Sequence, residues 1–464
     1  HQGGAGGATL DEDGVRRFLQ PVFEQRGEQP LLGPFVDVLR HRGGLFGERG
    51  DRFQFAHLTF QEYLAAQFLS RQWQQQPPGF LAKIVSDEWW REVLLLTIGS
   101  LGAPTPFERR QDFVKALCGL QAPLPAQVAA AELAATGLSD LVDPEPVLVG
   151  MARERLVALL QDKALPTVKP QGRAAAGRAL SLVGDPRPGV GTRRVALKEG
   201  EIEIPDLTWC TVPAGSFLMG AEDITNDEKP RHSVSLPAFK ISRYPVTQAQ
   251  YALFVEAGGY GERRYWLPDG WKYKERENWK GPRDRGVPFN LPNHPVVAIS
   301  WYEMAAFCGW LTEVLQGAGL LDGKELVTLP SEAEWEKAAR WTDGRTYPWG
   351  NRWEDNRANT DETKIGSTTA VGLFPEGASP YGCLEMAGNV WEWTRSLYNK
   401  AYPYNPADGR EDLKADASRH RVLRGGSFLN NQYFARCAVR FRSSPDDFSV
   451  SVGFRVVSLS ASGL

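Results

Sequence analysis

The stretch Leu329-Pro-Ser-Glu-Ala-Glu-Trp-Glu-Lys-Ala-Ala-Arg340 predicts the start of a helix inside a domain that is otherwise rich in loops. Ser331 and Glu334 form a capping box, in which each side chain accepts a hydrogen bond from the backbone N–H of the other residue. The same box recurs upstream at Ser300-Trp-Tyr-Glu303 and at Thr247-Gln-Ala-Gln250. Three helices are therefore expected in this part of the chain.

Few other regular elements surround these helices. Two short alternating segments, His232–Leu236 and Arg421–Arg424, predict strands. Twelve of the 15 tryptophans lie beyond residue 195, among many glycines and prolines. Long irregular loops with many aromatic residues must pack on their own side chains. We therefore expect a loop-rich α+β domain over residues 196–464, preceded by a mostly helical region.

The preceding region divides into two parts. Residues 1–75 mix helical and short-strand patterns, and Thr59-Phe-Gln-Glu62 has the spacing of a capping box that begins a helix. Residues 76–195 show only helical patterns, in which Ala-rich amphipathic stretches alternate with Pro and Gly breaks. This alternation is typical of stacked helical repeats followed by a linker. The predicted helices cover Gln127–Thr136, Pro146–Gln161 and Gly172–Leu182.

Composition excludes several functions. The net charge is -3 and no basic recognition stripe is present, so nucleic acid is not an expected partner. The longest apolar runs, such as Val93–Ile98, are too short to cross a bilayer. The five cysteines are odd in number and widely spread, which is typical of a reducing compartment. We therefore expect a cytoplasmic protein without a nucleic-acid or membrane partner.

Eight motifs occur in order along the C-terminal region. They are Pro213-Ala-Gly-Ser-Phe-Leu-Met-Gly220, Ile241-Ser-Arg-Tyr-Pro-Val-Thr247, Pro295-Val-Val-Ala-Ile-Ser-Trp301, Leu329–Arg340, Tyr347-Pro-Trp-Gly-Asn351, Met386-Ala-Gly-Asn-Val-Trp-Glu-Trp393, Leu423-Arg-Gly-Gly-Ser427 and Gly453-Phe-Arg455. Each motif is short, but the ordered set resembles the formylglycine-generating enzyme (sulfatase-modifying factor) family. The resemblance implies a C-type-lectin-like fold of the formylglycine-generating-enzyme type for residues 196–464.

Enzymes of this family oxidise a substrate cysteine at two active-site cysteines that bind copper, since Cu(I) prefers thiolate ligands. In the family pattern these cysteines follow Arg-Gly-Gly-Ser at a Cys-x4-Cys spacing. This chain reads Arg424-Gly-Gly-Ser-Phe-Leu-Asn430, so Asn430 stands at the first position and the second cysteine is missing. Cys437 matches a later family position. We therefore expect no enzymatic activity, and a copper-dependent formylglycine-generating-type oxidase is the alternative.

A second enzymatic branch, the ergothioneine-type sulfoxide synthases, adds an iron-binding histidine cluster in a helical domain. The six histidines of this chain are His1, His41, His57, His232, His294 and His420. No two of them have the i, i+3 or i, i+4 spacing that places ligands on one helix face, so this branch is disfavoured.

The variable proteins of diversity-generating retroelements share this fold and resemble the chain more closely. Their stretch between the Arg-Gly-Gly-Ser and Gly-Phe-Arg elements is hypermutated at adenines, usually within Asn codons. Here that stretch, called the window below, covers Phe428–Val452. Randomised AAY codons yield no Trp, Met, Lys, Glu or Gln, and only Gln432 in the window belongs to these types. The composition therefore favours a hypervariable window.

Within the window, Ala435–Arg442 alternates between arginine and apolar residues and predicts a strand. Period two places Arg436, Ala438, Arg440 and Arg442 on one face and Cys437, Val439 and Phe441 on the other. General burial preferences favour an apolar inner face, whereas the resemblance implies inward arginines paired with carboxylates. We adopt the second alternative, with Asp446, Glu385 and Glu392 as expected acid partners.

On this alternative, the apolar side of the window faces the ligand. The expected ligand-binding residues are Phe428, Leu429, Asn431, Tyr433, Phe434, Cys437, Val439, Phe441, Ser443, Phe448, Val450 and Val452. Exposed aromatic residues without neighbouring charge are typical anchors for a protein partner. A sugar site would combine Trp with carboxylate and amide pairs, which the window lacks. We therefore expect a protein ligand.

Some family members bind calcium in the loop that contains Gly-Asn-x-Trp-Glu-Trp. The resemblance places the calcium ligands at Glu385, Gly388, Val390 and Glu392, with Gly388 and Val390 contributing carbonyl oxygens. Two carboxylates and two carbonyls suit this hard cation. The alternative is an ion pair between Glu392 and a buried arginine of the C-terminal strand.

The segment Phe55-Ala-His-Leu-Thr-Phe-Gln-Glu-Tyr-Leu-Ala-Ala66 resembles the winged-helix region that ends the NACHT module of STAND NTPases. No Gly-x4-Gly-Lys-[Ser/Thr] loop occurs in the sequence, so this chain is not expected to bind nucleotide itself. We expect the NTPase domain upstream in the same polypeptide. A further alternative for the C-terminal domain is an invariant glycan-binding or sensor module of such an NTPase.

Overall fold

The computed structural model describes residues 9–42, 46–49, 52–55, 57–100, 107–198, 200–222, 225–398 and 401–460. The chain divides into two compact units, His1–Gln121 with Thr136–Leu148, and Ala122–Ala135 with Val149–Leu464. The helices α7 (Leu124–Ser139) and α8 (Pro146–Leu160) each contribute residues to both units. The second unit therefore includes helices that precede the domain expected over residues 196–464.

The first unit contains six α-helices and one small sheet among its described residues. The helices are α1 (Glu12–Gln25), α2 (Leu32–Arg42), α3 (Leu58–Gln72), α4 (Phe80–Ile84), α5 (Arg91–Ser100) and α6 (Phe107–Cys118). The strands β1 (Thr9–Asp11), β2 (Phe46–Arg49) and β3 (Arg52–Phe55) form an antiparallel sheet in the order β1-β3-β2. Among the described helices, none is both long and apolar enough to cross a membrane.

The expected capping box at Thr59-Phe-Gln-Glu62 is wrong. Helix α3 begins at Leu58, and its N-cap is His57. The backbone of His57 is extended, and its side chain makes no capping hydrogen bond. Thr59 therefore lies inside the first turn, where its own backbone is already helical. A hydroxyl in that position cannot take the N-cap role, because the cap residue must have a non-helical backbone.

The second unit holds two four-stranded sheets and two hairpins among its described residues. One sheet has the order β10 (Glu325–Thr328), β15 (Val457–Ser460), β9 (Phe239–Ser242) and β6 (Trp209–Val212). The other has the order β13 (Phe441–Ser443), β12 (Arg421–Arg424), β11 (Trp391–Leu397) and β14 (Val452–Gly453). The hairpins pair β4 (Thr192–Leu197) with β5 (Gly200–Pro205), and β7 (Gly215–Met219) with β8 (His232–Leu236). All pairs are antiparallel except β11 with β14.

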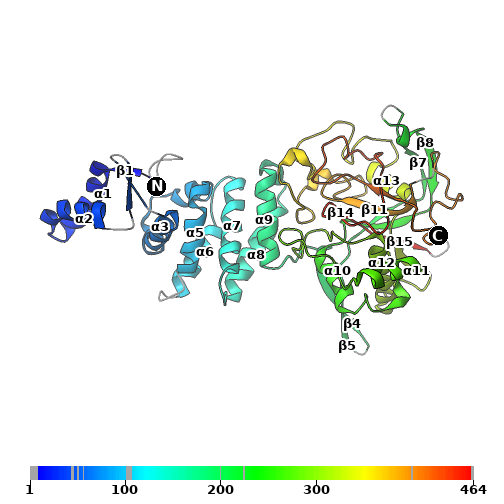
Figure 1. Cartoon of the computed structure of the whole chain (residues 1–464), viewed down its shortest axis with the longest axis horizontal. Helices are drawn as coiled ribbons and strands as arrows, with labels where there is room; N and C mark the ends of the chain where they lie inside the picture. Colours follow the sequence, from blue (N-terminus) through cyan, green and yellow to red (C-terminus); the bar gives the residue numbers. More distant parts are fainter. Residues whose placement is uncertain are drawn as a thin grey trace. The chain divides into compact units, whose positions relative to one another are not determined.

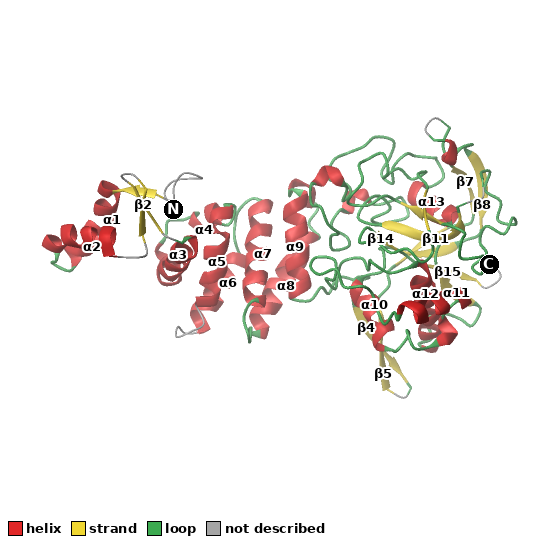
Figure 2. Ribbon diagram, in the orientation of Figure 1, coloured by secondary structure: helices red, strands yellow, loops and turns green. Residues whose placement is uncertain are grey.

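Besides α7 and α8, five described α-helices belong to the second unit, and three of them begin at capping boxes that the sequence predicts. The five are α9 (Pro170–Leu182), α10 (Gln248–Glu256), α11 (Pro268–Glu277), α12 (Trp301–Gly317) and α13 (Glu332–Arg340). Complete capping boxes open α10, α12 and α13, at Thr247, Ser300 and Ser331. Loops nevertheless form most of this unit (Figure 2). The mixed α+β class, with a helical region before a strand-containing domain, is confirmed.

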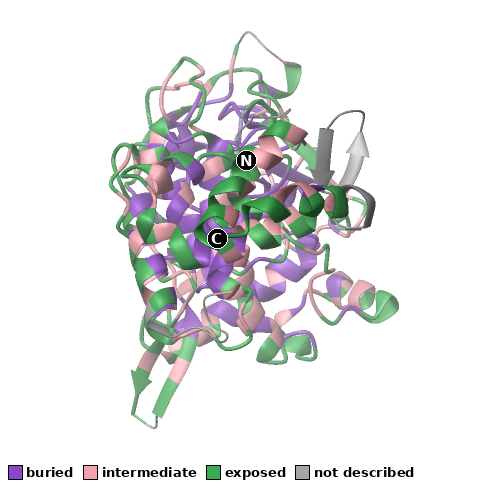
Figure 3. Cartoon of the chain, turned by 90° about the vertical axis from the view of Figure 1, so that its left-hand side faces the viewer, coloured by how far each residue is buried: buried purple, intermediate pink, exposed green. Residues whose placement is uncertain are grey.

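Buried aromatic and aliphatic side chains fill this unit in two large clusters. Buried residues of the chain are purple in Figure 3. One is centred on α12, with Trp301, Phe307 and Phe454 fully buried. The other surrounds α13, whose Trp335 is also fully buried. Strands and loops pack around these two helices, which is why so few regular elements still produce a buried core.

Candidate ligand-binding surface

The segment expected to form a strand, Ala435–Arg442, forms turns up to residue 440, and only Phe441–Ser443 belongs to a strand, β13. The side chains of this segment therefore do not alternate between a buried face and an exposed face. Arg436 and Arg440 are buried as expected, but Cys437 and Val439 are buried with them, and Arg442 is exposed. The physical reason is that turns let consecutive side chains point inward, which an extended strand does not allow.

Arg436 and Arg440 fix this part of the window to distant carboxylates. The guanidinium of Arg436 donates to both oxygens of Glu228, at 2.9 and 3.0 Å. The guanidinium of Arg440 donates to both oxygens of Glu332, at 2.7 and 3.1 Å. Arg436 and Arg440 thus point inward as expected, whereas Arg442 does not, and the expected partners Asp446, Glu385 and Glu392 are wrong.

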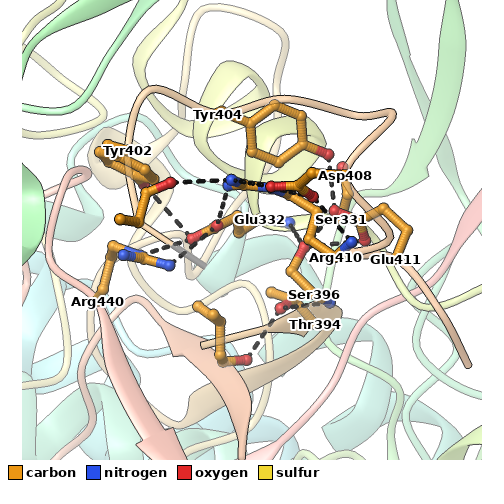
Figure 4. Close-up of polar contacts among 12 residues, drawn as sticks. Ser331, Glu332, Thr394, Ser396, Tyr402, Tyr404, Asp408, Arg410, Glu411 and Arg440 are labelled. Carbon is orange, nitrogen blue, oxygen red and sulfur yellow. Dashed lines mark hydrogen bonds and ion pairs between the residues drawn. The ribbon is translucent and has the colours of Figure 1, made fainter. Parts of the chain in front are cut away.

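Glu332 is the centre of a larger network, which Figure 4 shows. Its carboxylate is fully buried and also lies 3.3 Å from the Arg424 guanidinium and 3.4 Å from that of Arg410. The hydroxyl of Tyr402 also donates to the Glu332 carboxylate, at 3.4 Å. Burial lowers the pKa of Arg440, but the Glu332 carboxylate more than compensates, so the pKa is raised and the ion pair is stable. Desolvated charges of this kind persist only when their hydrogen bonds are well satisfied.

Five of the twelve expected ligand-binding residues are exposed, and we call these five the window surface. They are Leu429 (59% exposed), Tyr433 (39%), Phe441 (51%), Phe448 (41%) and Asn431. Three more of the expected ligand-binding residues are half-buried, namely Phe434, Ser443 and Val450. The other four are buried, namely Phe428, Cys437, Val439 and Val452. These four side chains do not reach the surface, contrary to the expected ligand face.

The aromatic part of the window surface is held by a tryptophan outside the window. Trp391 stacks on Phe441, with ring centroids 5.5 Å apart and planes at 27°. Phe434 contacts Trp391 edge-on at 6.3 Å and Tyr433 at 5.3 Å. Sequence reasoning missed this role of Trp391, although its motif was recognised. The rings form one connected row from Tyr433 to Phe441.

Two depressions lie next to the window. One, of about 640 Å³, is lined by Phe448, Tyr273, Trp279 and neighbouring polar residues. The other, of about 340 Å³, is lined by Phe289, whose ring lies 5.9 Å from that of Phe428. Arg283 lines both, and its guanidinium lies 3.7 Å from the centroid of the Phe448 ring. Of the window surface, only Phe448 lines one of these depressions.

The window has one thiol, so it does not supply the two thiolates of the family's copper site. Asn430 accepts a hydrogen bond from the Ser427 hydroxyl at 2.7 Å. Cys437 is the one thiol of the window, it is fully buried, and burial raises its pKa to about 12. A neutral, enclosed thiol is neither a good nucleophile nor a metal ligand at neutral pH.

The residues expected to bind calcium do not fit it as a set. Both oxygens of Glu392 accept from Arg455, at 2.6 and 2.8 Å, and one also accepts from the Trp335 indole. This is the alternative ion pair with the C-terminal arginine. One oxygen of Glu385 accepts from the backbone of Gly372, and the other is buried without a partner. Among the described residues, no group of three or more His, Cys, Asp or Glu could hold a metal ion.

Curated relatives of the chain are enzymes and one protein named as inactive. The formylglycine-generating enzyme of Thermomonospora curvata is 31% identical, over 53% of this chain and 91% of that protein. The inactive C-alpha-formylglycine-generating enzyme 2 of Mus musculus is also 31% identical, over 53% and 84%. A hercynine oxygenase of Mycolicibacterium smegmatis is 32% identical, over 47% of this chain. The chain spans only about half the length of the hercynine oxygenases, 53% of that one.

Two solved structures have similar shapes over part of the chain. PvdO from Pseudomonas aeruginosa covers 59% of this chain and 98% of its own, with 24% identity and a TM-score of 0.44. Treponema denticola variable protein 1 covers 57% and 98%, with 19% identity and a TM-score of 0.40.

Family profiles match two parts of the chain. Residues 8–69 match the winged helix-turn-helix domain C-terminal to NACHT. Residues 198–459, more than half of the chain, match the sulfatase-modifying factor enzyme 1-like domain. The chain therefore belongs to the sulfatase-modifying factor enzyme 1-like family.

Proposed function

We propose that the chain is a non-catalytic recognition protein whose window surface binds a protein ligand, as in the variable proteins of diversity-generating retroelements. The observation that carries the proposal is the exposure of Leu429, Tyr433, Phe441 and Phe448 on a segment in which Arg436 and Arg440 are buried in ion pairs. Large apolar side chains left in water, next to depressions, are typical of protein-binding anchors.

The chemistry of the window supports a role without catalysis. Its one thiol, Cys437, is sealed, and Asn430 stands at the first cysteine position of the family pattern. A relative with 31% identity is itself named as inactive. The alternative function is a copper-dependent oxidase of the formylglycine-generating class. Turnover of a cysteine-containing peptide in the presence of copper would establish that alternative and overturn the proposal.

We further propose a cytoplasmic protein in which an NTPase domain acts together with this chain. The support is the match of residues 8–69 to a domain described as C-terminal to NACHT. The hypervariable nature of the window belongs to the same proposal. Sequencing the locus for a reverse transcriptase and a near-copy of codons 421 to 455 tests it, and an invariant window across isolates would contradict it.

Binding is tested by capture with matched variants. The whole chain is used to capture partners from its source lysate, alongside Phe441→Ala, Leu429→Ala and Leu320→Ala. Leu320 is 43% exposed outside the window and serves as the control for Leu429. A partner retained by wild type and by Leu320→Ala should bind the window variants about 10- to 30-fold more weakly, as expected for anchor residues. Equal capture by all four proteins would contradict binding through the window surface.

A further inference from the structure

The loop of residues 356–373, which we call the bridging loop, is held on one side by helix α9. The Arg173 guanidinium donates to the carbonyls of Asn356 at 3.1 Å and Leu373 at 3.3 Å, which lie at the two ends of the loop. The Gln171 amide donates to the carbonyl of Thr363, in its middle, at 2.6 Å. Figure 1 shows α9 beside this part of the second unit. Helix α9 therefore grips the loop at three points.

The fit between α9 and the bridging loop is close. Arg173 is fully buried, and burial lowers its pKa to about 10. A Cβ at Gly177 would lie 2.8 Å from a methyl of Leu373 and 2.9 Å from the Ala370 Cβ. Real side chains do not approach so closely, so glycine is required there for helix and loop to be in contact. Helix α9 and the bridging loop therefore pack without room for a methyl group at this point.

The other side of the bridging loop is attached to the window. The short helix η7 (Asp361–Thr363) contributes the Asp361 N–H, which donates to the carbonyl of Asn430 at 2.9 Å. The carboxylate of Glu362 accepts from the Gln432 N–H at 2.8 Å. The same three-residue element thus contacts the window by its first two residues and α9 by its third.

A second connection runs through Asn389. The N–H of Phe428 donates to the Asn389 carbonyl at 3.1 Å, and the N–H of Asn389 donates to the Asn359 carbonyl at 2.8 Å. The side chains of Asn359 and Asn389 also meet at 3.2 Å. Every second residue from 428 to 432 is therefore tied by its backbone to the bridging loop, directly or through Asn389. The side chains of Leu429 and Asn431, between them, remain exposed.

We infer that the bridging loop couples the window surface to α9, so that a ligand on the window changes how firmly α9 is packed. The inference rests on the proposed function of the window. A ligand that shifts residues 430–432 displaces η7, and η7 carries the carbonyl that Gln171 holds. Coupling of this kind is reciprocal, so loosening α9 must also loosen the window.

Amide hydrogen exchange of the whole ligand-free chain tests the coupling in both directions. Gln171→Ala removes one hydrogen bond to the bridging loop, and should speed exchange of the Asp361 and Gln432 amides about five-fold, the effect of one hydrogen bond. Glu362→Ala, on the window side, should speed exchange in α9 at residues 173–178, whose amides are hydrogen-bonded within the helix. The reciprocal response distinguishes coupling from local loosening.

A glycine substitution that pushes α9 away from the loop, together with a matched control, gives a second test. Gly177→Ala pushes α9 away from the loop, whereas Gly150→Ala, in α8, adds its methyl where no atom lies within 4 Å. The first should speed exchange at residues 428–432 and the second should not. Wild-type exchange at residues 428–432 in both Gln171→Ala and Gly177→Ala would overturn the inference. If Gly177→Ala does not fold, Gln171→Ala decides alone. Because no ligand is used, this outcome is independent of whether the capture experiment finds a partner.

Discussion

At the residue scale, the electrostatics of the window depend on two carboxylates that lie far from it in sequence. Glu228 and Glu332 accept from Arg436 and Arg440, respectively, and all four groups are buried. The resemblance predicted that these arginines point inward, and this is confirmed. Their partners could not be predicted, because pairing across a hundred or more residues depends on how loops pack and not on a local pattern.

We predict that Arg440→Met lowers the free energy of unfolding by about 3 to 5 kcal/mol, because it leaves Glu332 without its closest partner in a buried site. The matched control is Arg442→Met, two residues away, whose side chain is exposed. It should change stability by less than about 0.5 kcal/mol. Urea unfolding followed by fluorescence measures both, and similar losses in the two variants would refute the assignment.

His294 provides a pH-dependent prediction. Burial, followed by the charge of Arg178, lowers its pKa to about 3, and its Nδ1 lies 3.0 Å from the Thr368 hydroxyl. Since the folded pKa lies below the unfolded one, the unfolded state binds more protons below pH 6.5. Stability is therefore full above that pH and falls as the pH falls.

Between pH 7.5 and pH 5, the wild type should lose about 2 kcal/mol more unfolding free energy than His294→Gln, which cannot titrate. Urea unfolding at the two pH values measures the difference. Parallel losses in both proteins would show that His294 is not responsible.

At the element scale, capping chemistry predicted three of four helix starts, and alternation predicted two of three strands, because His232–Leu236 and Arg421–Arg424 both form as expected. The boxes at Thr247, Ser300 and Ser331 are all formed, because a cap depends on four consecutive residues. The strand expected over Ala435–Arg442 is mostly turns, because ion pairs to two distant carboxylates outweigh a local pattern. Local periodicity predicts an element only where tertiary contacts agree with it.

The two threonine positions give a paired prediction. Thr247→Ala should lower the unfolding free energy by about 1 kcal/mol or more, because its hydroxyl caps α10 and also donates to the Val190 carbonyl. Thr59→Ala should cost less than about 0.5 kcal/mol, because Thr59 lies inside α3 and caps nothing. Chemical denaturation measures the unfolding free energy of both variants. A large loss in Thr59→Ala would show that Thr59 does cap α3, as the sequence predicted.

At the scale of the whole molecule, family resemblance predicted the fold of residues 196–464, and the matched family domain covers residues 198–459, but the compact unit also includes helix α9. The linker and α9 look like a separate helical region in sequence. In the structure, Arg173 and Gln171 bind the bridging loop, and the Asn293 amide donates to the Gly177 carbonyl at 3.0 Å. These contacts join residues far apart in the chain, so no local signal reveals them.

We predict that a fragment of residues 196–464 unfolds about 10 °C lower than one of residues 122–464, since it loses the buried contacts of α9. Both fragments keep every residue of the window. Calorimetry or circular dichroism measures the two transitions. Equal melting temperatures would show that α9 is not part of the folding unit.

The attachment of residues 428, 430 and 432 has an evolutionary consequence. It uses N–H and C=O groups that every amino acid except proline supplies in the same form. Exchange of the side chains at these positions and between them therefore leaves the attachment chemically unchanged. Substitutions can therefore change the exposed side chains of this segment one at a time, while its backbone stays hydrogen-bonded to the same groups. A proline at 428 or 432 would remove the backbone N–H that donates there, and so would weaken the attachment.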